Sequence, residues 1–117
     1  MAGVTFKKLA AVHQGAEVDA GSDIIAAVTV KRTGLLLVTV SVDTSTVVQI
    51  GIDDLTSDDE STREVLDLNG GAALTAGRDY VFTHTALSGY AYSLVNKSGA
   101  AASTIPHASF VIEEAVG

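Results

Sequence analysis

Hydrophobic and polar residues alternate in short segments along most of the chain. A period of two is typical of strands that bury one face and expose the other. The positions expected on the buried faces are Ile24, Ala26, Val28, Val30, Leu36, Val38, Val40, Val42, Val48, Ile50, Ile52, Leu66, Leu68, Tyr80, Phe82, Tyr90, Tyr92, Leu94, Phe110 and Ile112. These segments predict strands that share one core.

Turn-forming residues separate the segments at intervals of roughly ten residues. Thr33-Gly34, the "DTST" run at 43–46, Asn69–Gly71 and the "NKSGAAAS" run at 96–103 each favour a change of direction. The N-terminal "VTFKKLA" also alternates and adds one more strand. The pattern predicts an all-β, antiparallel sandwich or barrel, and of these we expect a jelly-roll-like β-sandwich of seven or eight short strands.

The length of 117 residues fits a single core. We expect an N-terminal strand or extended arm at 1–22 and a β-sandwich domain at 23–117. The core must rely on Val, Leu, Ile and Ala, because the chain has three Phe, three Tyr and no Trp. Such a core buries little area per residue, so we expect added stability from a homo-oligomer.

Composition narrows the partners and the compartment. The net charge is -7 with only seven Lys and Arg, which makes nucleic acid an unsuitable partner. The longest apolar run, Gly34–Val42, is far shorter than the roughly 20 residues of a membrane span, so we expect no membrane association. The N-terminus lacks the apolar region of a signal peptide, and the absence of cysteine excludes disulfides and thiolate chemistry.

The glycine-rich stretch "LDLNGGAALTAGRDYVF" at 66–82 raises the question of a phosphate-binding loop. A dinucleotide-binding fingerprint requires G-x-G-x-x-G before a helix, and a P-loop ends in Gly-Lys-Ser/Thr. Here Gly70-Gly71 and Gly77 have another spacing and precede an expected strand. We therefore interpret the stretch as strand, tight turn, small-residue crossing and strand.

Carboxylates and histidines are the candidate metal ligands of this chain. Asp53, Asp54, Asp58 and Asp59, followed by Glu60, form an acidic loop without the glycine of a Ca²⁺-binding EF-hand. We expect no metal centre and interpret the loop as solvated, with these four aspartates as candidates for weak cation binding. His13, His84 and His107 are too widely spaced to form a sequence-level zinc motif, and His84 is expected at the end of an inward face.

Catalytic motifs are absent from the sequence. There is no G-x-S-x-G nucleophile elbow, although a pair of carboxylates for glycosidase chemistry is not excluded by sequence. We expect no enzymatic activity, no cofactor, and no catalytic or cofactor-binding residues. Tyr80, Tyr90 and Tyr92 would form a sugar-binding platform if they were exposed, but their alternation places them with the core instead.

The order of turns and strands resembles a known family. "TGLLLVTVSVDTSTVVQI", "LNGGAALTAG" followed by "YVF", "SGYAYSLVNKSGA" and the final "FVIEEA" are similar to small β-sandwich virion proteins of tailed bacteriophages and prophages. The resemblance covers about residues 28–116. The acidic segment Asp53–Glu64 departs from the family pattern, and the first 25 residues match nothing specific in it.

The resemblance implies a structural virion component, namely a head decoration protein, the base of a head fibre, or a tail-associated piece. It implies partners of two kinds: copies of itself, often as a trimer, and the major capsid protein or other virion proteins. Its location would be the virion, after synthesis in the host cytoplasm. A carbohydrate- or receptor-binding β-sandwich module is the alternative, and the N-terminal residues are considered as an arm that lies on a neighbouring subunit.

Overall fold

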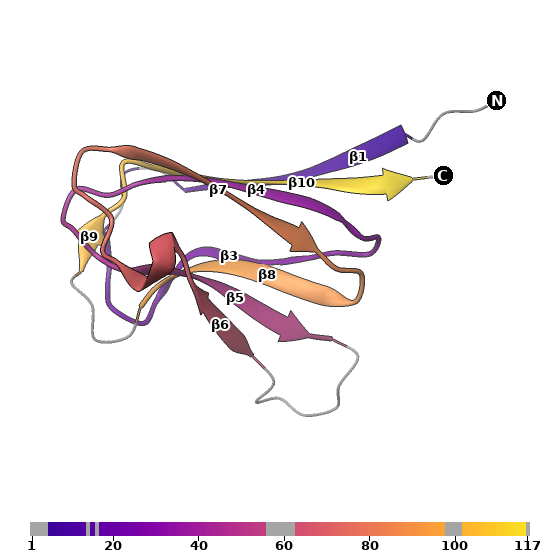
Figure 1. The fold of residues 1–117 in the computed structure, drawn as a ribbon, viewed down its shortest axis with the longest axis horizontal. Coiled ribbons are helices and arrows are strands. Elements are labelled where there is room, and N and C mark those ends of the chain that lie inside the picture. The colour runs from indigo at the N-terminus through magenta and orange to yellow at the C-terminus, as the bar shows by residue number, and fades with distance from the viewer. Residues whose placement is uncertain (1–4, 14, 16, 56–62, 98–101, 117) are drawn as a thin grey trace.

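The computed structural model describes residues 5–13, 15, 17–55, 63–97 and 102–116 of the protein. The described residues form ten strands and one single 3-10 turn, Asn69–Gly71 (Figure 1). The strands are β1 (Thr5–His13), β2 (Glu17–Val18), β3 (Asp23–Thr29), β4 (Gly34–Ser41), β5 (Val48–Asp54), β6 (Glu64–Asp67), β7 (Asp79–Ala86), β8 (Tyr90–Asn96), β9 (Ser103–Thr104) and β10 (His107–Val116). The prediction of an all-β protein is confirmed.

The eight longer strands form two four-stranded antiparallel sheets in the order β1-β10-β4-β7 and β3-β8-β5-β6. β2 and β9 form a two-stranded sheet of their own. Among the eight longer strands, every connection except β5 to β6 crosses from one four-stranded sheet to the other. This alternation between two packed sheets is the connectivity of a jelly roll, and the two layers are visible in Figure 1.

The core lies between the two sheets, where the alternating positions of the sequence meet. On β4 the inward residues Leu36, Val38 and Val40 are fully buried, while the outward residues Leu35 and Leu37 are exposed. Phe110 and Ile112 of β10 face the same core, as predicted. On β4 and β10, which pair in a regular register, the period of two therefore predicts the buried face correctly.

β3 departs from the predicted alternation. Its pairing with β8 shifts register twice, between Asp23 and Ile25 and again between Ile25 and Val28. Each shift inserts an unpaired residue and changes which side chains face inward. As a result Ile24 and Ile25 are both buried, and the prediction that Ala26 faces the core is wrong because Ala26 is exposed.

Leu66 is a second departure. It lies across from Ile50 on the core-facing side, but it remains 44% exposed, whereas Leu68 is buried as predicted. The reason is its position on β6, which is the last strand of its sheet. Because β5 covers Leu66 from one side only, the other side of its side chain faces solvent.

The two turns predicted from glycine are confirmed. Asn69, Gly70 and Gly71 have φ values of 56°, 65° and 86°, and Gly77 has 80°. These angles lie in the left-handed region, which glycine adopts without strain. The chain leaves β6 through the first turn, crosses to the other sheet, and enters β7 after the second.

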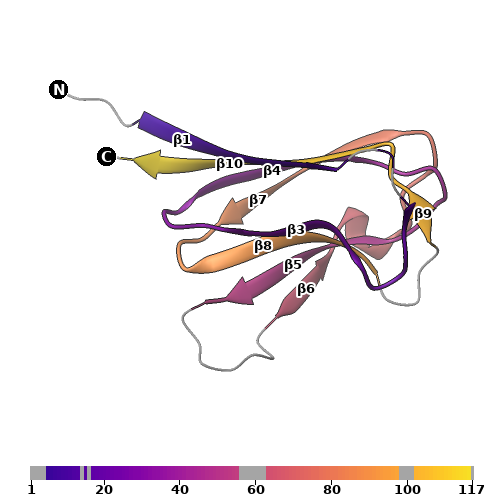
Figure 2. The same cartoon turned by 180° about the vertical axis from the view of Figure 1, so that it is seen from behind.

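β1 pairs with β10 at nine consecutive positions, from Thr5 opposite Val116 to His13 opposite Ala108. Of the two forms considered for residues 1–22, a strand or an extended arm, the structure has a strand at this place. The pairing brings the start of β1 and the end of β10 to the same end of the molecule, and β9 lies at the opposite end (Figure 2).

Buried polar side chains close the end of the sandwich near β2 and β9. Asn96 is fully buried and donates from Nδ2 to the carbonyl oxygen of Val18 at 3.0 Å. Its Oδ1 accepts a hydrogen bond of 2.6 Å from the hydroxyl of Thr46. Asn96 thereby ties β2 and the loop before β5 to β8, because a buried amide must find partners within the protein.

Candidate functional site

The outer face of the β1-β10-β4-β7 sheet has an uncharged centre. Leu35 and Leu37 of β4 are 47% and 36% exposed, and Val81 of β7 is 62% exposed. The strand registers place these three residues beside other outward-facing uncharged residues of β4, β7 and β10. We call the whole set the uncharged face: Leu35, Leu37, Thr39, Val81, Thr83, Thr85, Ser109 and Val111. Glu113 and Asp79 lie at its two ends.

An uncharged surface of this kind is unusual in a chain with a net charge of -7. Exposed apolar residues that stand singly are normal on proteins, but contiguous apolar patches mark interaction sites. Leu37 lies between Val111 and Thr83 in the register of three adjacent strands, so the apolar atoms are contiguous across the sheet. This surface is suited to contact with another protein surface.

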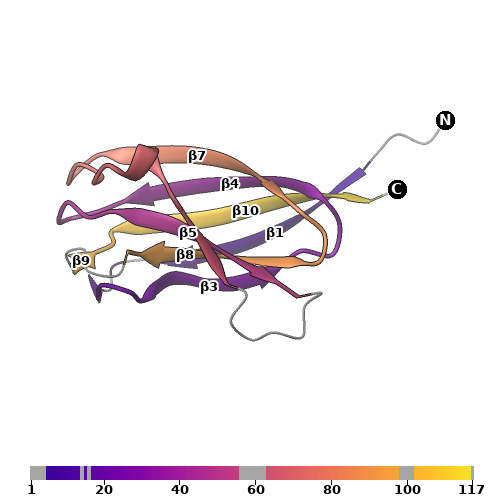
Figure 3. The ribbon, with the colours of Figure 1, turned by 60° about the horizontal axis from the view of Figure 1, so that its bottom comes forward.

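The outer face of the other sheet carries paired polar side chains beside the exposed Val65 of β6, and Arg63 spans it. The Arg63 guanidinium donates to Ser93 Oγ on β8 at 2.5 Å and forms an ion pair of 2.8 Å with Asp23 of β3. Gly51 of β5 leaves room for this path, because a Cβ there would lie 2.6 Å from Nη2 of Arg63. Figure 3 shows β5, β8 and β3 side by side. The ion pair with Asp23 therefore requires the Arg63 side chain to extend across these strands.

A second polar group on this sheet surrounds Asp67. Gln49 donates from Nε2 to Oδ1 of Asp67 at 2.6 Å, and Lys97 lies 3.4 Å from Oδ2. The hydrogen bond from Gln49 lowers the pKa of Asp67 below its usual value, against an opposing effect of desolvation, and the charge of Lys97 adds to the lowering. Asp67 and Lys97 are thus paired within the chain, which gives both charged side chains a structural role.

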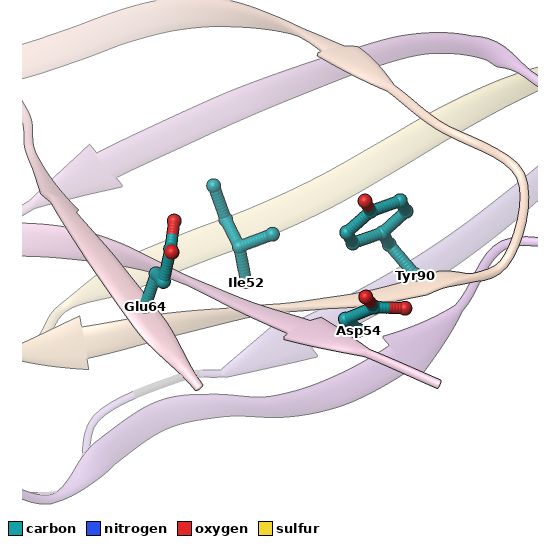
Figure 4. A pocket seen from close by; sticks show the side chains of 4 residues that line it. All are labelled: Ile52, Asp54, Glu64 and Tyr90. Carbon is teal, nitrogen blue, oxygen red and sulfur yellow. The ribbon is translucent and has the colours of Figure 1, made fainter. Parts of the chain in front are cut away.

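A small pocket lies on the inner side of the β3-β8-β5-β6 sheet, where Ile52, Asp54, Glu64 and Tyr90 line a volume of about 150 Å³ (Figure 4). The register explains the grouping, since Ile52 lies across from Glu64 and Asp54 across from Tyr90. The volume is below the roughly 300–1,000 Å³ of ordinary small-molecule clefts. Two carboxylates and a phenol suit hydrogen bonds to hydroxyl groups or a hydrated cation.

Of the four aspartates considered for cation binding, the structure describes Asp53 and Asp54. Asp53 and Asp54 are the last residues of β5 and face opposite sides of the sheet, so they cannot chelate one ion together. Asp58, Asp59 and Glu60 lie outside the described residues. In the part of the chain that the structure describes, no group of three or more His, Asp or Glu is arranged to hold a metal ion.

The sequence pattern does not predict that Glu64 and Tyr90 lie beside Asp54. Asp54, Glu64 and Tyr90 come from three different strands, and only the pairing registers of β5 with β6 and with β8 bring them together. The available signal was the alternation itself, which gives Asp54 the same parity as Ile52. It does not reveal which strands will be neighbours.

His84 and His107, the two histidines whose side chains the structure describes, face opposite sides of their sheet. His84 is half-buried on the inward side of β7, with its ring edge-on to Tyr92 at a centroid distance of 6.0 Å, which agrees with its predicted position. His107 lies on the outward side of β10, across from Ser41. The side chain of His13 lies outside the described part of the structure.

The three tyrosines do not form a common exposed platform. Tyr92 is 1% exposed, and its hydroxyl accepts a hydrogen bond from the backbone of Leu87. Tyr80 is half-buried and stacks on Phe82 at a centroid distance of 6.1 Å. Contacts with Thr75, whose amide donates to the Tyr80 hydroxyl, lower the pKa of this phenol. Tyr90 lines the pocket described above, beside Asp54.

Comparisons with known families and curated proteins identify no relative of this chain. No protein-family model matches the sequence, and no curated protein matches it either. Among the described residues, no helix has the length and apolar character that a membrane crossing requires.

Proposed function

We propose that the protein is a structural virion protein that decorates or stabilises the capsid of a tailed phage or virus. It would act through contacts with other copies of itself and with the major capsid protein or other virion proteins. The observation that carries the proposal is the uncharged face, because this acidic chain leaves Leu35, Leu37 and Val81 exposed on one sheet.

Two further observations support a structural role. Jelly rolls are the fold of many viral capsid domains and also of lectins, so the fold agrees with the resemblance without assigning a function alone. The polar side chains of the other sheet, Arg63 and Asp67 among them, are paired within the chain. Their pairing gives them a structural explanation that requires no substrate.

The proposal is tested by binding to purified heads of the virus whose genome encodes this chain, after removal of the resident protein. Leu37→Lys places a charge in the centre of the uncharged face and should reduce occupancy on heads by at least about tenfold. Val65→Lys is the matched control, since Val65 is exposed on β6 of the other sheet. Equal occupancy of wild type, Leu37→Lys and Val65→Lys would contradict the proposal.

A second candidate function is carbohydrate or receptor binding at the pocket of Ile52, Asp54, Glu64 and Tyr90. The observation that favours it is the partly exposed Tyr90 ring beside two carboxylates, a combination that can stack on a sugar and accept its hydroxyl hydrogens. Titration with monosaccharides, followed by NMR, should shift signals of Ile52 and Glu64 as well as Tyr90, and Tyr90→Ala should abolish the shifts of Ile52 and Glu64. A spectrum that no sugar changes would reject this candidate.

A further inference from the structure

The sandwich has four sheet edges, and three of them carry features that hinder pairing with another strand. β3 contains two register shifts, and β6 is only four residues long. β1 contains Lys7 and Lys8 in its sequence. Short strands, bulges and lysines are the devices by which proteins protect the open edges of their sheets.

The fourth edge, β7, lacks these features. It is eight residues long, and its pairing with β4 runs without a register shift from Asp79 to Ala86. It contains no proline and no lysine, and Asp79 is its only acidic residue. Within the described part of the chain, β7 is the last strand of its sheet, and Figure 3 shows it at the upper margin.

We propose that β7 pairs antiparallel with β7 of a second copy of this chain, about a twofold axis perpendicular to the sheet. The two four-stranded sheets would then form one continuous eight-stranded sheet through backbone hydrogen bonds, as in other cases of strand addition. A twofold contact of this kind brings the same surface of each copy together.

The distribution of charge leaves the β7 edge open to a second copy. Two molecules that each carry a net charge of -7 repel one another over most of their surfaces. Residues 80–86 of β7 contain no Asp, Glu, Lys or Arg, and the uncharged face adjoins them. This edge is therefore a place where two copies can meet without opposing carboxylates.

The sequence of β7 also selects a register. If Thr83 lies across from Thr83 of the second copy, then Val81 meets Thr85 and Phe82 meets His84, and the outward and inward sides of the strands match. Residues 80–86 then pair entirely with one another, and Asp79 remains outside the paired segment. The uncharged face becomes continuous across the two copies.

This proposal deepens the self-association in the proposed function and rests on that part of it alone. It does not require a capsid, because the contact forms between free molecules. It also specifies twofold symmetry, whereas the family resemblance implies homo-oligomers that are often trimers.

The test is the mass of the purified protein in solution, measured by sedimentation or light scattering over a range of concentrations. We expect about 24 kDa for wild type, twice the 12.0 kDa of one chain. Thr83→Lys and Thr83→Asp should each weaken the dimer by roughly tenfold or more, because like charges then lie opposite one another. An equimolar mixture of the two variants should restore it.

The matched control is Thr29→Lys, the same change at an exposed residue of the β3 edge, and it should leave the mass of wild type unchanged. Circular dichroism of each variant establishes that it is folded. A wild-type mass of 12.0 kDa at every concentration, a trimer, or a dimer that Thr83→Lys does not weaken would overturn the proposal. Head occupancy of Leu37→Lys is a separate measurement, so failure of either idea can be recognised independently.

Discussion

The outer face of the β3-β8-β5-β6 sheet pairs polar side chains with one another and exposes Val65 at its edge, whereas the outer face of the β1-β10-β4-β7 sheet exposes apolar side chains on adjacent strands. Arg63 reaches from beside β6 to Asp23 on β3, and on the way it donates a hydrogen bond to the fully buried Ser93. On the other sheet, Leu35 is 47% exposed and Val81 is 62% exposed. The first face contributes to folding, and the second is available to a partner.

The largest effect should come from comparing the two sides of β4. Leu36→Ala removes a fully buried side chain and should lower the free energy of unfolding by about 3 kcal/mol. Leu37→Ala on the outer side should change it by less than about 0.5 kcal/mol. Urea denaturation measures both, and a cost at Leu37 equal to that at Leu36 would show that the uncharged face is needed for folding.

Gly51→Ala should disrupt the polar face. The added Cβ would collide with Ser93 Oγ and lie 2.6 Å from Nη2 of Arg63, so the arginine must leave its path. We expect a loss of about 2 kcal/mol in the free energy of unfolding, in the range of other overpacked sites. Adding Ser93→Gly removes one colliding atom and should recover part of the loss. A thermal melt unchanged by Gly51→Ala would contradict the described path of Arg63.

Arg63→Met should have a smaller effect, about 1 kcal/mol. The methionine retains apolar contact but leaves Asp23 and the buried Ser93 without the guanidinium, and exposed ion pairs contribute little. Chemical denaturation of the single variants and of Arg63→Met combined with Asp23→Asn measures the coupling. Strictly additive effects would show that the ion pair contributes nothing.

The smallest effect is the pH dependence at Asp67. Its pKa is lowered below 3.8 in the folded protein, so the carboxylate stabilises the fold above that pH, and the stabilisation is lost as the pH falls through the lowered pKa. Wild type should therefore exceed Asp67→Asn in stability at neutral pH, and the difference should shrink below about pH 4. A difference that is the same at pH 3 and pH 7 would contradict this assignment.

Much of the fold could be predicted from residues that alternate within a single strand. The inward positions of β4 and β10 follow from their sequence because both strands keep a regular register. β3 could not be predicted in the same way, because its bulges arise from pairing with β8 and reverse the side on which Ala26 lies. Local sequence does not encode the partner strand.

The candidate sites follow the same division. Leu35 and Leu37 are recognisable in the sequence as apolar residues at outward positions, yet only the sheet order shows that Val81 and Val111 lie beside them. The pocket and the path of Arg63 depend wholly on contacts between strands far apart in the chain. The pairing of Asp54 with Tyr90 is an example, since neither residue has a sequence motif.

The pairing of β1 with β10 also affects the time course of folding. Within the described part of the chain, the strand partners of residues 5–13 are residues 108–116, nearly the whole chain away. During synthesis the N-terminal strand must therefore wait, unpaired on that side, until the C-terminal strand has left the ribosome. Folds dominated by such distant pairings complete in roughly milliseconds to seconds rather than microseconds. The closure of this sheet should therefore be a late step in folding.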